Sequence, residues 1–170
     1  MFLGFNIDLR FDRDAIANGQ WYRILTSNFV HSNDAHLAMN MAGVGALWLL
    51  HHHFFSVTKY WLYLCAISLV TTLLIYIFSS NIDIYVGLSG TLHGLIAYGA
   101  IKDLQNKEKT GWLLLVGVIA KVTYEQTIGA SSDLETLIES RVAIEAHLFG
   151  LLCGLALGAI ELLSIKKPKH

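Results

Sequence analysis

The sequence is poor in charged residues, proline and cysteine. Only 15% of its 170 residues are charged, against about 25% in soluble domains. Together with 54% hydrophobic residues, this shortage excludes an ordinary soluble domain and a disordered chain. The two cysteines, Cys65 and Cys153, both lie in apolar segments, so we expect no disulfide. No basic patch with interleaved aromatics appears, and we expect no nucleic-acid partner.

Long apolar segments are what the sequence has instead. A helix that crosses a membrane needs about 20 mostly apolar residues. Five segments are candidates, over about residues 36–50, 60–79, 86–101, 111–128 and 142–163. We therefore expect a single all-α integral membrane domain over residues 1–170. It would comprise an outer loop region (1–35), a transmembrane bundle in contact with lipid (about 36–163) and a basic tail (164–170).

The distribution of basic residues predicts the orientation of the bundle. Seven lysines lie in two alternate loops and the C-terminal tail, whereas four arginines and most acids lie on the opposite side. Because basic residues favour the cytoplasmic side, the C-terminus is expected there. Five spans then place residues 1–35 outside, with no span or signal peptide before them. We expect that a preceding span is missing from this chain.

The run Gly87-Leu88-Ser89-Gly90 opens the third candidate span and supplies a candidate nucleophile. A serine there could simply cap the helix, and Gly90 with Gly94 could simply allow close helix packing. The functional alternative is that the glycines let a substrate backbone approach the Ser89 hydroxyl. Backbone N–H groups at the helix start could then stabilise an oxyanion.

Two histidines are candidate bases for this serine. His147 lies one turn before Gly150, on a last span whose glycines, including Gly154, form a smooth face. If that face packs on the glycines of the third span, His147 reaches Ser89. His93, four residues after Ser89, is its neighbour on the same helix. Helix geometry alone leaves both histidines open.

His36 and Asn40 lie four residues apart and share one face at the start of the first span. Two side-chain donors in this place could complete an oxyanion hole. A helix cap followed by a packing asparagine is the structural alternative.

Lys121 and Glu125, with Tyr124 between them, place charge inside the fourth span. A lysine and a glutamate four residues apart can pair, which lowers the cost of burying either one. The pair is therefore either a structural clasp or part of a polar substrate pocket.

Together these motifs resemble the rhomboid intramembrane serine proteases over about residues 19–160, with Gly19-Gln20-Trp21-Tyr22-Arg23 as a further match. The resemblance implies a Ser–His dyad of Ser89 and His147, without an acid. It assigns His36 and Asn40, with the Ser89 backbone N–H, to the oxyanion hole. It also implies a six-helix core, which fits a missing first span. No cofactor or metal is implied. In the family's usual Trp-Arg pair of the outer loop, the position before Arg23 is here Tyr22.

Two runs resemble a subgroup, the rhombosortases, namely residues 89–94 and 121–126. This resemblance implies a bacterial inner-membrane enzyme whose active site opens to the periplasmic side. Its substrates would be secreted proteins with a C-terminal Gly-rich motif, an apolar helix and a basic tail. His93, Lys121, Tyr124 and Glu125 would then line a substrate pocket. The alternatives are a rhomboid protease with other substrates, a non-catalytic rhomboid-like protein that binds membrane clients, or a small transporter.

Overall fold

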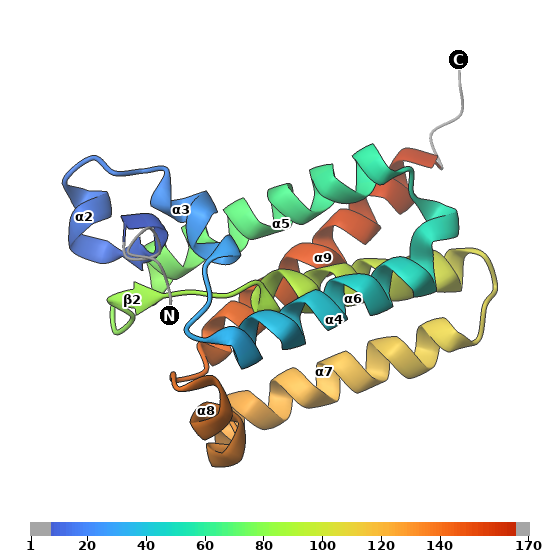
Figure 1. The fold of residues 1–170 in the computed structure, drawn as a ribbon. Coiled ribbons are helices and arrows are strands. Elements are labelled where there is room, and N and C mark those ends of the chain that lie inside the picture. The colour runs from blue at the N-terminus through green and yellow to red at the C-terminus, as the bar shows by residue number, and fades with distance from the viewer. Residues whose placement is uncertain (1–7, 166–170) are drawn as a thin grey trace.

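The computed structural model describes residues 8–165, and five long helices dominate it (Figure 1). They are α4 (Asp34–His51), α5 (Val57–Phe78), α6 (Ser89–Gln105), α7 (Thr110–Ile128) and α9 (Ile144–Ile165). Each long helix overlaps one of the five segments that the sequence marks as candidate spans. An all-α bundle is thus what the apolar segments form, and the chain is a multi-pass membrane protein.

Fewer than five of these helices are long and apolar enough to cross a membrane on their own. Among residues 8–165, only α5 and the Ile144–Leu163 part of α9 are long and apolar enough to cross a membrane alone. Helix α7 and the short helix α8 (Ser132–Ile138) are long and apolar enough only when taken together, and they are bent by 95° relative to each other. Helix α6 is shorter, with 17 residues, whereas α4 and α7 are long enough but carry polar residues that lower their mean hydropathy. The predicted count of five spans, and the missing first span, stay predictions.

Residues 8–33, which we expected to form a loop region, carry small ordered elements at one end of the bundle (Figure 1). They are β1 (Phe11–Asp12), α2 (Arg13–Ala17), α3 (Arg23–Thr26) and the 3-10 turn η1 (Ser27–Phe29). Strand β1 pairs antiparallel with β2 (Ile84–Tyr85), just before α6. This layer is therefore tied to the segment that carries Ser89.

One arginine attaches this layer to the end of α5. The Arg13 guanidinium donates hydrogen bonds to four backbone carbonyls at the end of α5 and just beyond, at 2.7–3.2 Å: Ile75, Tyr76, Ser79 and Ile82. The last carbonyls of a helix have no partner within the helix and carry partial negative charge, so a cation is favoured there.

Helices α6 and α9 form the centre of the bundle and touch backbone to backbone. A Cβ atom on Gly150 would lie 1.8 Å from the Gly90 carbonyl oxygen, and one on Gly154 would lie 2.0 Å from that of Gly94. Neither position can hold a larger residue unless the helices move apart. The glycine face predicted for the last span therefore meets the glycines of the third.

Two of the lysines expected on the cytoplasmic side, Lys59 and Lys102, lie close together at the other end of the bundle, and the tail lysines lie outside the described residues. Glu161 of α9 lies 3.4 Å from both Lys59 and Lys102. In Figure 1, the 3-10 turn η2 (His52–Phe54) and the α6–α7 connection lie at this end, away from α2, α3 and α8. The start of α6, with Ser89, lies at the opposite end.

Candidate active site

Ser89 is the first residue of α6, and His147 lies on the first turn of α9. The Ser89 hydroxyl and His147 Nε2 are 2.9 Å apart, which is hydrogen-bonding distance. His147 is buried, with 4% of its surface exposed. The backbone contact between α6 and α9 thus brings together the serine and the histidine that the family resemblance assigns.

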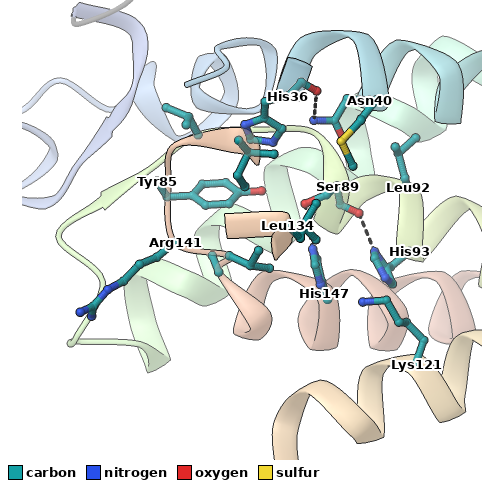
Figure 2. A pocket seen from close by; sticks show the side chains of 15 residues that line it. His36, Asn40, Tyr85, Ser89, Leu92, His93, Lys121, Leu134, Arg141 and His147 are labelled. Carbon is teal, nitrogen blue, oxygen red and sulfur yellow. Dashed lines mark hydrogen bonds between the residues drawn. The ribbon is translucent and has the colours of Figure 1, made fainter. Parts of the chain in front are cut away.

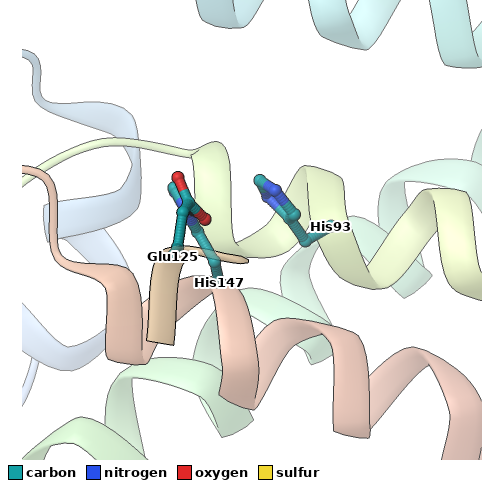
Figure 3. A group of neighbouring side chains, drawn as sticks. All are labelled: His93, Glu125 and His147. Atoms are coloured by element: carbon teal, nitrogen blue, oxygen red, sulfur yellow. Dashed lines mark hydrogen bonds and ion pairs between the residues drawn. The ribbon is translucent and has the colours of Figure 1, made fainter. Parts of the chain in front are cut away.

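His93 contacts the backbone of Ser89 and not its hydroxyl. Its Nδ1 lies 2.8 Å from the Ser89 carbonyl oxygen, which can only accept, so Nδ1 is a donor there. Its ring stacks on the His147 ring, with centroids 4.0 Å apart and planes inclined by 17° (Figure 3). The structure therefore pairs the Ser89 hydroxyl with His147 and places His93 against the face of the His147 ring.

Glu125 of α7 contacts the far side of the His147 ring. Its Oε2 lies 2.7 Å from His147 Nδ1, and its Oε1 accepts a hydrogen bond from the Lys121 ammonium. Glu125 is 2% exposed. The sequence showed the pair with Lys121 but not the contact with His147, because α7 and α9 meet only in the folded bundle. One signal was available: a glutamate inside a span needs more partners than one flexible lysine.

His36 and Asn40 lie on α4 beside the peptide that precedes Ser89 (Figure 2). The Ser32 hydroxyl, 3.0 Å from His36 Nδ1, holds the His36 ring, and Asn40 Nδ2 donates to the His36 carbonyl at 3.2 Å. Gly87 has a φ of +113°, and a Cβ atom there would lie 2.6 Å from His36 Nε2. Only glycine lets the chain pass this close to His36. Both side chains therefore border the same cavity as Ser89, and their role as oxyanion donors stays a prediction.

A cavity of about 230 Å³ contains these groups (Figure 2). Its walls include His36, Asn40, Ser89, His93, Lys121, Arg141 and His147. Of the residues expected in a substrate pocket, His93 and Lys121 line it. Tyr124 and Glu125 are not among its lining residues, since Tyr124 is 57% exposed and Glu125 is buried against His147.

A second, more apolar groove of about 370 Å³ adjoins this cavity. Residues of α4, α6 and α7 line it, and it shares Leu92, His93 and Lys121 with the first cavity. The groove therefore opens towards the cavity that contains Ser89.

His93, Glu125 and His147 offer ligand atoms that all lie within 4.8 Å of one another, the spacing of a metal site. The geometry of the rings argues against a shared ion. Ring nitrogens bind metals in the plane of the ring, and stacked, nearly parallel rings direct these lone pairs side by side. Both His147 nitrogens also already have partners, in Ser89 and Glu125.

His31 is a further buried histidine near the site, in the loop before α4. Its ring makes an edge contact with His36, with centroids 5.0 Å apart. Burial, and secondarily the charge that His36 can carry, lower the pKa of His31 from 6.5 to about 4. His31 is therefore neutral at physiological pH.

Comparison with known proteins points to one family. Residues 18–164 match the family model described as Rhomboid domain. Over 139 residues the chain is 25% identical to the Bacillus subtilis (strain 168) protein named "Putative rhomboid protease YdcA". That alignment covers 82% of this chain and 66% of the relative, so the chain spans just under two thirds of the relative's length.

Proposed function

The chain belongs to the rhomboid domain family, and from this premise we propose that it is an intramembrane serine endopeptidase. The observation that carries the proposal is the 2.9 Å contact between the Ser89 hydroxyl and His147 Nε2 inside a helical membrane bundle. A serine and a base within hydrogen-bonding distance form the arrangement that acyl transfer requires.

The chemistry would proceed by two acyl transfers. His147 Nε2 takes the Ser89 proton while Oγ bonds to the scissile carbonyl carbon, and the protonated His147 then gives this proton to the leaving nitrogen as the C–N bond breaks. Water, deprotonated by His147, attacks the acyl-enzyme, releasing a carboxylic acid and regenerating the Ser89 hydroxyl. In both steps the Ser89 N–H, His36 and Asn40 stabilise the negative charge that develops on the carbonyl oxygen.

Our proposal places the active site on the outer side of a bacterial inner membrane, with the C-terminus in the cytoplasm. One observation supports it. Ser89 lies at the opposite end of the bundle from Lys59 and Lys102, and basic residues favour the cytoplasmic side. An apolar substrate helix would enter through the groove between α4 and α7.

For substrates, we propose secreted proteins with a C-terminal Gly-rich motif, an apolar helix and a basic tail, as for a rhombosortase. The 230 Å³ cavity is smaller than most small-molecule pockets, which begin at about 300 Å³. A small cavity favours residues without bulky side chains at the scissile bond. Glycine also destabilises a helix by about 1 kcal/mol relative to alanine, which favours the local unwinding that exposes the scissile bond.

A serine-reactive fluorophosphonate probe tests the proposed activity. The purified protein in detergent should be labelled, and Ser89→Ala should abolish both labelling and cleavage of a rhomboid substrate. His147→Ala should be as inactive, and the double variant little worse than either, because the two residues act as a unit. A folded wild-type protein that neither reacts nor cleaves would favour a client-binding role instead.

Substrate class is tested by comparing two substrates that differ only at the glycines. A substrate with Gly-Gly before the apolar helix should be cleaved faster than one with Leu-Leu. Mass spectrometry of the released product separates hydrolysis from transfer, since hydrolysis leaves a free C-terminal carboxylate and transfer attaches an amine. Equal rates for the two substrates would contradict the Gly-rich specificity but not the protease.

A further inference from the structure

We propose that Glu125 is a positioning residue that converts the Ser89–His147 pair into a three-residue relay. The inference rests on the proposed function and extends it, because the pattern that the chain resembles has only two members. It assigns a role in the chemistry to a residue that the sequence presented as a clasp or a pocket wall.

The contact has the geometry of an orienting hydrogen bond. Glu125 Oε2 lies 2.7 Å from His147 Nδ1 (Figure 3), whereas the Ser89 hydroxyl contacts the other ring nitrogen, Nε2. This length is typical of a charge-assisted hydrogen bond. Glu125 is 2% exposed and His147 is 4% exposed, so water has little access to compete for either group.

The carboxylate determines which ring nitrogen of His147 carries the proton. An ionised carboxylate only accepts hydrogen bonds, so Nδ1 must be the donor. In the neutral ring Nε2 is then unprotonated and presents its lone pair to the Ser89 hydroxyl. This tautomer is the one that a general base for Ser89 requires. When His147 takes up the Ser89 proton, the carboxylate also stabilises the imidazolium.

Lys121 supports this arrangement from the other oxygen. Its ammonium donates to Glu125 Oε1, which keeps the buried carboxylate ionised and fixes its rotation. The Lys121 side chain is 50% exposed and reaches the wall of both cavities. If Glu125 served only to pair with Lys121, its Oε2 would need no partner on another helix. The contact between Oε2 and His147 Nδ1 therefore distinguishes the relay from a structural clasp.

Glu125→Gln provides a sharp test because Lys121 determines how the new amide is oriented. The ammonium favours the amide oxygen at the Oε1 position, which turns the NH₂ group towards His147 Nδ1. Nδ1 must then accept, so the proton moves to Nε2 and the ring can no longer take the Ser89 proton. We expect kcat to fall by about 10²–10⁴-fold with KM changed far less. Wild-type kcat in Glu125→Gln would overturn the proposal.

Removing Lys121 should partly reverse this loss. In Lys121→Met/Glu125→Gln the amide is free to turn its oxygen towards Nδ1, which restores the productive tautomer in part of the molecules. We expect at least about tenfold more activity than in Glu125→Gln alone. A double variant no more active than Glu125→Gln would overturn the tautomer explanation.

NMR of protein labelled with ¹⁵N-histidine reads the tautomer without any substrate. The signals of His147 are identified as those that disappear from the spectrum of the His147→Gln variant. The wild type should show a protonated Nδ1 and an unprotonated Nε2, and Glu125→Gln the reverse. Glu161→Gln, in another lysine-paired glutamate far from Ser89, should leave the His147 signals unchanged. An unchanged tautomer in Glu125→Gln would mean a structural role and overturn the proposal.

The two proposals fail in different ways. A wild-type protein that neither cleaves nor reacts with a fluorophosphonate would refute the protease, whatever Glu125 does to the ring. A wild-type protease with an equally active Glu125→Gln variant would refute only the relay.

Discussion

Gly150→Ala should separate α6 from α9 and inactivate the proposed enzyme without touching a catalytic group. A Cβ atom at residue 150 would lie 1.8 Å from the Gly90 carbonyl oxygen, whereas Cβ atoms in proteins stay beyond 3.0 Å. The two helices must therefore move apart by about 1 Å at this contact. Residue 150 is one turn from His147, so the 2.9 Å contact with Ser89 would lengthen to about 4 Å, beyond hydrogen bonding.

Two effects of different size follow from this displacement. Overpacking should lower the free energy of unfolding by about 1–3 kcal/mol. A misplacement of about 1 Å in the dyad should lower kcat by about 10²-fold. Cleavage of a fluorogenic transmembrane substrate in liposomes measures the second effect, and thermal unfolding in detergent measures the first.

Matched glycines separate loss of activity from loss of folding. Gly154→Ala meets a similar obstruction, 2.0 Å from the Gly94 carbonyl oxygen, but lies one turn further from the site. It should destabilise the protein comparably and reduce activity less. Gly45→Ala, in α4 with no atom within 4 Å of its Cβ, should change neither property much. Full activity in a folded Gly150→Ala protein would refute the reasoning, as would a larger activity loss in Gly154→Ala.

Three further predictions follow from contacts in and near the site. Asn40→Ala should lower kcat by about 10²–10³-fold, with KM little changed, if its amide stabilises the oxyanion; an unaltered kcat in steady-state kinetics would count against that role. His93→Phe retains an aromatic ring against the base and should keep more activity than His93→Ala, by about two- to tenfold; equal rates for the two variants would show that the stacking is not needed. Burial lowers the pKa of His31 to about 4, so the unfolded chain takes up this proton first. Stability should be fully present above about pH 6.5 and decline as the pH falls towards about 4. The melting temperature of His31→Gln should depend less on pH over this range, and parallel curves for the two proteins would contradict the assignment.

Much of the fold could be predicted from the sequence, because each long helix coincides with its own apolar segment. The charge-free segment at 60–79 became α5 with its ends moved by one to three residues, and the segment at 142–163 became α9. Apolar content did not reveal the small elements of residues 8–33, because helices of four or five residues leave no periodic pattern. The sequence also gave no reason to place Arg13 at the end of α5, since that contact joins positions over 60 residues apart.

The candidate site was readable to the extent that its residues lie on recognisable motifs. Ser89, His147, His36 and Asn40 each stand in a motif with fixed spacing, and the structure brings all four together at one end of the bundle. Their catalytic roles stay predictions. Glu125 is different, because its i+4 pairing with Lys121 offered a sufficient local explanation. Its second partner lies on another helix, and only the packing of α7 against α9 reveals it.

Arg13 sets an order of events during synthesis of the chain. Its four carbonyl partners lie 62–69 residues later in the sequence, at and just beyond the end of α5. The guanidinium therefore leaves the ribosome long before the helix end that it will hold exists. Residues 8–17 cannot adopt their final packing until α5 has been synthesised and inserted into the membrane. The layer at this end of the bundle is thus expected to assemble late, although its sequence is translated first.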